Sequence, residues 1–170
     1  MPVASRNAGA SGAPHPLLSD WFDVEPEAVA EMRSVLVVGS AADARMFRAA
    51  AHVEHVGTVE HLPGGGTFDV VAAIDCLADV SALRTALAAL AAAVGPGGRL
   101  LIITVGAPDG PSPDELSPLS AAGLALVSFD DMTDGSMPGG VPGDRSSGGG
   151  RARRWLRAVY VRPPHEDRDI

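Results

Sequence analysis

Side chains with the potential for chemistry lie in the middle of the chain, next to its apolar stretches. Asp75 and Cys76 directly follow the apolar run 68–74. If that run is a strand of a parallel sheet, Asp75 stands at its carboxyl end, where such sheets bind ligands. Cys76 is followed by Leu and Ala, so we expect it to pack in the core.

Three histidines, His52, His55 and His61, fall within ten residues of one another. A metal ion needs ligands that converge on one point. On a predicted strand over 55–60 these rings point to separate places, so we expect no metal site. The sequence also lacks a Ser/His/Asp arrangement, a P-loop and a zinc-type spacing, so it identifies no catalytic residue.

Three continuous apolar runs predict strands buried on both faces of a parallel sheet, over 34–39, 68–74 and 99–105. A helix over 81–94 should join the last two, because its leucines recur at helical spacing before a Gly-Pro-Gly-Gly stop. The other expected elements are helices over 21–33, 43–51 and 113–122, a second strand over 55–60, and an antiparallel pair over 124–130 and 155–162. This order predicts an α/β fold with a Rossmann-like, mostly parallel sheet, helices on both faces and a C-terminal antiparallel hairpin.

Composition predicts one domain with three flexible segments. The 170 residues suit a single domain, which we expect over 20–163. Residues 1–19 read as a disordered leader, 135–150 as a flexible loop rich in Gly, Ser and Pro, and 164–170 as a disordered tail. Four arginines near the predicted hairpin form a basic patch that we expect to be solvated: Arg151, Arg153, Arg154 and Arg157.

Charge and cysteine content exclude several classes of protein. The net charge is −8, and such a surface repels phosphate backbones, so we expect no nucleic-acid partner. The single cysteine permits no internal disulfide, which suits a reducing, cytoplasmic setting. The longest apolar run, 86–94, is far too short to span a membrane.

Two motifs carry a resemblance to a known family. The strand opening FDVV (68–71) and the turn GPGGRL (95–100) flank the predicted helix. This arrangement resembles the fourth strand, the following helix and the fifth strand of class I S-adenosylmethionine (SAM) methyltransferases. The resemblance extends over about residues 34–163 and implies SAM as the cofactor and a small molecule as the methyl acceptor.

The loop after the first strand departs from the family pattern, which reads acidic-x-Gly-x-Gly-x-Gly. Here the sequence is VVGSAAD (37–43), and only Gly39 matches. Glycines in such a loop let the backbone approach the cofactor closely. The 28 residues over 40–67 are also too few for the two helices and two strands of the family, which need roughly 40–50 residues. We therefore expect one helix–strand unit to be missing and SAM to bind more weakly than about 100 μM.

The resemblance assigns the cofactor contacts by position. Gly39, Ser40 and Ala41 would form the cofactor loop, and Asp75 would contact the methionine part or the substrate. If 55–60 is the second family strand, Glu60, which is 21 residues after Gly39, would bind the ribose hydroxyls. If 55–60 is instead the third strand, Thr58 would lie near the adenine. The spacing favours the first alignment.

Two functions remain open on these residues. One is an active SAM-dependent methyltransferase that acts on a small molecule. The other is a non-catalytic, methyltransferase-like pseudoenzyme that has lost SAM binding and serves as a binding or partner module. The partner is accordingly a small-molecule substrate or another protein, and the oligomeric state is open.

Overall fold

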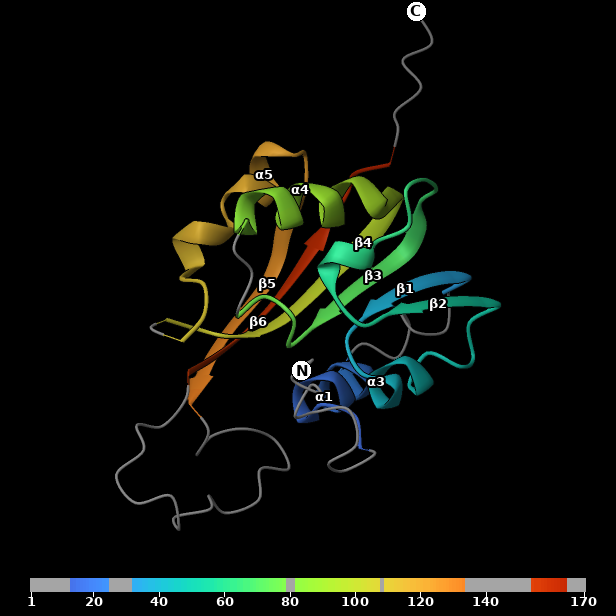
Figure 1. Ribbon diagram of the computed structural model, residues 1–170, viewed down its shortest axis with the longest axis horizontal. Coiled ribbons are helices and arrows are strands. Elements are labelled where there is room, and N and C mark those ends of the chain that lie inside the picture. Colours follow the sequence, from blue (N-terminus) through green and yellow to red (C-terminus); the bar gives the residue numbers. More distant parts are fainter. Residues whose placement is uncertain (1–12, 25–31, 79–81, 108, 134–153, 165–170) are drawn as a thin grey trace, which may run out of the picture.

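A computed structural model describes residues 13–24, 32–78, 82–107, 109–133 and 154–164. Its centre is one six-stranded sheet with the strand order β2-β1-β3-β4-β6-β5 (Figure 1). The strands are β1 (Ser34–Val38), β2 (His52–Val56), β3 (Phe68–Ile74), β4 (Val94–Val105), β5 (Ala125–Thr133) and β6 (Arg154–Val161). The first four are mutually parallel, and β6 lies antiparallel between β4 and β5. The predicted α/β fold with a C-terminal antiparallel hairpin is therefore confirmed.

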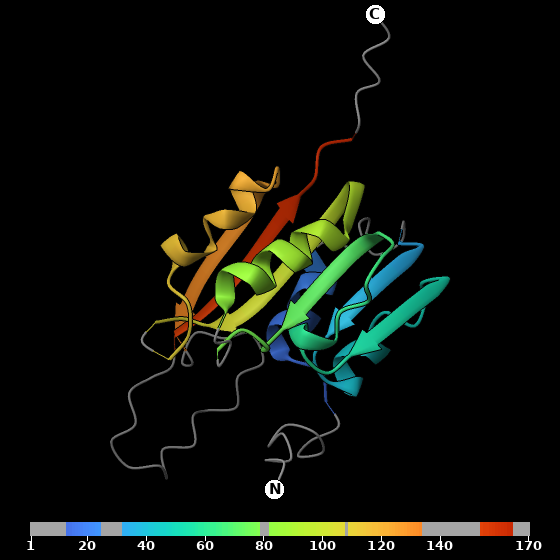
Figure 2. The same ribbon diagram turned by 45° about the horizontal axis from the view of Figure 1, so that its top comes forward.

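Helices cover both faces of this sheet, as Figures 1 and 2 show. On one side lie α1 (Pro16–Val24) and α3 (Ala41–Arg45). On the other lie α4 (Leu83–Ala93) and α5 (Pro118–Ala121), together with the short 3-10 helices η1 (Val59–His61) and η2 (Pro113–Leu116). Each side has its own apolar cluster, one built around Leu87 and Leu90 of α4, the other around Leu17 and Trp21 of α1.

The three predicted apolar strands are confirmed as neighbours with parallel pairing. Residues Val35–Val38 and Val70–Ile74 are all buried, as the continuous apolar runs predict. Asp69 of the FDVV motif faces solvent and accepts hydrogen bonds from the backbone N–H groups of Arg33 and Ser34. The motif thus aligns the starts of β3 and β1.

The GPGG segment differs from the prediction, because it begins β4 instead of forming a separate turn. Helix α4 ends at Ala93, and the extended backbone begins at Val94. A Cβ at Gly98 would lie 2.8 Å from the carbonyl oxygen of Gly95, so only glycine fits there. Arg162 fixes the same segment, since its backbone N–H donates to the Gly98 carbonyl and its Nη2 to the Ala91 carbonyl at the end of α4.

The second strand and the first helix are shifted from their predicted places. Strand β2 covers 52–56, not 55–60, and Glu60 lies in η1 beyond it. Helix α1 begins at Pro16, inside the expected leader, and its end at Val24 overlaps the start of the predicted helix over 21–33. Residues 25–31 of that prediction lie outside the described residues. Residues 40–67 hold a single α-helix and a single strand besides η1, which agrees with the expected loss of a helix–strand unit.

Several expectations fall on parts of the chain outside the described residues. These are the leader up to residue 12, the loop over 135–150 and most of the tail. Within the described ranges, no helix has the length and apolar character needed to cross a membrane.

Candidate functional site

The carboxyl ends of the parallel strands bring most of the predicted site residues to one edge of the sheet. Gly39 follows β1 and Asp75 follows β3, its parallel neighbour. Gly39 packs directly on β3, since a Cβ there would lie 3.0 Å from the carbonyl oxygen of Ile74 and 3.2 Å from its Cβ. The glycine is therefore required by the approach of two strands, whether or not a ligand is present.

The loop after Gly39 is closed by the chain's own polar groups. Ser40 caps α3, because its Oγ accepts from the backbone N–H of Asp43 at 3.1 Å. The same Oγ donates to Asp43 Oδ2 at 2.8 Å. Oδ1 of Asp43 accepts from the backbone N–H of His15, just before α1, at 2.7 Å. Asp43 is 5% exposed, so this carboxylate is a buried link between the loop and the N-terminal helix.

The backbone of Gly39 is also engaged. Its N–H donates to the carbonyl oxygen of Val56 at the end of β2. Its own carbonyl oxygen accepts from Nε2 of His55 at 2.6 Å. Ala41 is exposed as the first residue of α3. The backbone N–H and carbonyl of Gly39 and the side chain of Ser40 are thus hydrogen-bonded within the protein.

Asp75 adopts an uncommon backbone conformation for a residue other than glycine, with φ 51°. Its N–H donates to the carbonyl oxygen of Ile103 on β4 at 2.7 Å. Burial, and to a lesser extent the neighbouring Asp75 carboxylate, raises the pKa of the Cys76 thiol to about 12. Cys76 stays protonated at neutral pH and is not a nucleophile.

The sequence predicted Glu60 at the end of a strand, but β2 ends at Val56 and Glu60 lies beyond it. It is exposed on η1, and its neighbour Val59 packs into the apolar cluster on the α4 side. Helix α3, which follows the Gly39 loop, lies on the opposite face of the sheet. The prediction that Glu60 binds a ribose has no support from this placement.

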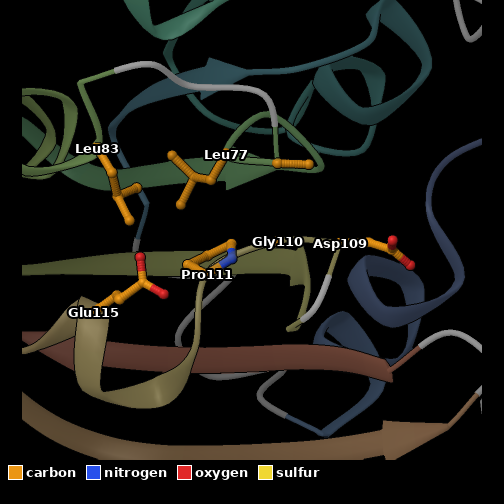
Figure 3. A pocket seen from close by; sticks show the side chains of 7 residues that line it. Leu77, Leu83, Asp109, Gly110, Pro111 and Glu115 are labelled. Carbon is orange, nitrogen blue, oxygen red and sulfur yellow. The ribbon is translucent and has the colours of Figure 1, made fainter.

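A small hollow opens near the ends of β3 and β4 (Figure 3). It is lined by Leu77, Ala78, Leu83, Asp109, Gly110, Pro111 and Glu115. In Figure 3 the carboxylate of Glu115 points toward Leu83 and Pro111. The Glu115 carboxylate accepts from the backbone N–H and the Oγ of Ser112, both at 3.2 Å, so its orientation is fixed.

This hollow is small for a cofactor, and none of the predicted cofactor residues lines it. Its volume is about 170 Å³, whereas small-molecule sites occupy roughly 300–1,000 Å³. Its lining contains none of Gly39, Ser40, Ala41, Glu60 and Asp75. The hollow and the five predicted cofactor residues therefore do not form one cavity in the described part of the chain.

The sequence did not predict three residues that form hydrogen bonds at the loop after β1. Asp43 could have been found, because Ser40 and Asp43 have the spacing of a helix cap. His15 gave no signal, since its neighbourhood reads as a leader, and its contact with Asp43 spans 28 positions. His55 was considered in the sequence only as a possible metal ligand, and its bond to Gly39 depends on the true position of β2. Among the residues that the structure describes, no three His, Cys, Asp or Glu side chains group as metal ligands.

Comparison with known proteins finds likeness in structure and not in sequence. No protein-family model matches the chain, and no curated protein matches it. The (4+2)-cyclase SpnF has 15% identity, with 86% of this chain and 81% of that chain covered and a TM-score of 0.57.

Two N-methyltransferases align similarly. NodS of Bradyrhizobium japonicum WM9, solved with S-adenosyl-L-homocysteine (SAH), has 12% identity over 88% of this chain and 89% of that chain, with a TM-score of 0.57. The 1,6-didemethyltoxoflavin-N1-methyltransferase of Burkholderia thailandensis, solved with its substrate and SAH, has 20% identity over 87% and 88%, with a TM-score of 0.53. The chain therefore has the fold of the class I SAM-dependent methyltransferases, as the resemblance of its central motifs implied.

Proposed function

We propose that this chain is a non-catalytic binding module with the methyltransferase fold, which has lost SAM binding. The observation that carries the proposal is the Asp43 carboxylate, which closes the loop after β1 through Ser40 and the backbone of His15. These bonds hold the loop in its present conformation, so a cofactor that needs another conformation would have to break them.

The cost of opening the loop can be compared with the free energy of cofactor binding. Hydrogen bonds to a charged group each contribute about 1.5–3 kcal/mol, so breaking two costs about 3–6 kcal/mol. A cofactor with a dissociation constant of about 100 μM gains about 5.5 kcal/mol on binding. The opening cost would therefore consume most or all of that gain.

A small-molecule methyltransferase is the second candidate function. It is favoured by Asp75, whose left-handed backbone lies at the ligand edge of the sheet, because such strained residues concentrate at functional sites. NodS, a neighbour in fold, is solved with SAH. The SpnF fold neighbour is named as a cyclase, so the same fold also serves other roles.

Isothermal titration of the full chain with SAH, with NodS as the positive control, tests the proposal. We expect no saturable binding at ligand concentrations up to about 1 mM, which corresponds to about 4 kcal/mol. The Ala41→Gly variant should not restore binding, because Asp43 still closes the loop. Micromolar SAH binding that is lost in Glu60→Ala would contradict the proposal and establish the second candidate.

A further inference from the structure

The exposed apolar surface of the described chain is concentrated on one edge strand. Among the described residues four large apolar side chains are exposed, and three of them lie on β5: Leu126 (50%), Val127 (62%) and Phe129 (37%). The fourth is Val24 on α1. Clusters of this kind mark interaction sites more often than scattered single residues do.

Strand β5 is also the last strand of the sheet on its side (Figures 1 and 2). Eight of its nine residues pair with β6, with a register shift at Val127 between Leu126 and Ser128. Within the described ranges no strand pairs with its outer edge. The opposite edge differs, because β2 has only five residues and exposes His52 and His55. Short, polar edges are protected from pairing, whereas long, apolar edges invite it.

The charges on β5 do not prevent association. Asp130 is paired with Arg157, and Asp131 with Arg154, both on the neighbouring strand β6. The chain has no lysine, the residue that most often guards such edges. The acids of β5 are thus compensated within the molecule, although the chain as a whole is acidic.

We infer that β5 pairs antiparallel with β5 of a second copy of this chain, about a two-fold axis at Phe129. A two-fold axis makes the same strand complementary to itself. In this register Phe129 faces Phe129 of the other copy, and Ser128 faces Asp130. No acid faces an acid, and the two exposed phenyl rings cover each other as a cross-strand aromatic pair.

The pairing depends on the sheet edge alone and is independent of whether SAM binds. With a second copy as the partner, the two six-stranded sheets join into one continuous sheet. An extended peptide from another protein is the competing occupant of the same edge.

The mass of the full chain in solution tests the pairing. Light scattering after size exclusion, over about 1–100 μM, should give twice the 17.3 kDa of one chain. Phe129→Lys should shift the protein to a monomer, because the two lysines would face each other across the two-fold axis. Val24→Lys is the matched control, because Val24 is 63% exposed and lies on α1. If the wild type were a monomer at every concentration, the inference would be wrong and a peptide would remain as the partner of this edge. The inference would also be wrong if the two lysine variants had equal effects on the mass.

Cross-linking tests the register separately. Directly opposite residues have Cα atoms about 4.5–5.5 Å apart, within the range of a disulfide. In a Cys76→Ala background, Phe129→Cys should form a disulfide-linked dimer on mild oxidation. Ala125→Cys should not, because its two copies would be about 27 Å apart along the strands. Efficient cross-linking at position 125, or none at 129, would overturn the proposed register.

Discussion

Arg157 should be the polar side chain on which the docking of the N-terminal helix most depends. It lies on β6, is 8% exposed, and reaches α1 with Nη1, which donates to Asp20 Oδ2 at 2.6 Å and to the Leu17 carbonyl at 3.2 Å. Its Nε and Nη2 donate to Asp130 Oδ2 on β5 at 3.1 and 2.9 Å. One guanidinium thus joins three elements.

The Arg157→Ala variant removes all of these bonds. The contact with Asp20, which is 26% exposed, should contribute about 1.5–3 kcal/mol as a hydrogen bond to a charged group. The pair with Asp130, which is 40% exposed, should add at most about 1 kcal/mol because water screens it. We expect Arg157→Ala to lower the free energy of unfolding by about 2–4 kcal/mol in total. In a chain of this size, each kcal/mol lost should lower Tm by about 2–4 °C.

Urea and thermal unfolding followed by tryptophan fluorescence measure this loss, because Trp21 on α1 and Trp155 on β6 are both buried. Arg157→Lys should recover only part of the stability, since an ammonium cannot bridge both carboxylates in a fork. Arg154→Ala is the matched control, as Arg154 also pairs with an aspartate but is exposed. If Arg157→Ala cost no more than Arg154→Ala, the assigned role of the buried guanidinium would be wrong.

Two further changes test other parts of the molecule. Burial lowers the pKa of His15 below its ordinary 6.5, with Asp43 opposing the shift, so the unfolded chain takes up the proton first and stability should fall as the pH drops below 6.5. His15→Gln should flatten this pH dependence in urea unfolding, and an unchanged slope would contradict it. Leu90 of α4 is fully buried, and Leu90→Ala should cost about 2–5 kcal/mol through the cavity it leaves. A loss below about 1 kcal/mol in the same assay would mean that the α4 face repacks freely.

The sequence correctly predicted the strands that are buried along most of their length. Residues 35–38 of β1, 70–74 of β3 and 100–105 of β4 are all buried, so these runs carry the apolar signal. Strand β2 lies at the edge of the sheet, and its residues HVEHV are partly polar and partly exposed. The predicted strand was therefore placed too late, over 55–60, where the segment VGTV follows. The burial of Arg157 was also missed, because a cluster of arginines normally indicates a solvated surface.

The candidate site was harder to predict than the fold, because its decisive contacts join distant parts of the chain. The sequence showed that the loop after Gly39 lacks the family's glycines, but not that Asp43 would fill the role of a closing group. The bond from His15 to Asp43 and the ion pair of Arg157 with Asp20 span 28 and 137 positions. Neither leaves a periodic pattern or a local motif, so pattern reasoning on one sequence cannot find them.

The place of β6 in the sheet has a consequence for synthesis on the ribosome. Strands β4 and β5 are both made before β6, which must insert between them. From Thr133 to Val161 the ribosome adds 28 residues, which takes about 1.5–6 s at typical rates of elongation. During that interval the apolar edge of β4 has no antiparallel neighbour from its own chain. Nascent chains that stall in this window would expose the edge of β4 that β6 later covers, and would be substrates for chaperones.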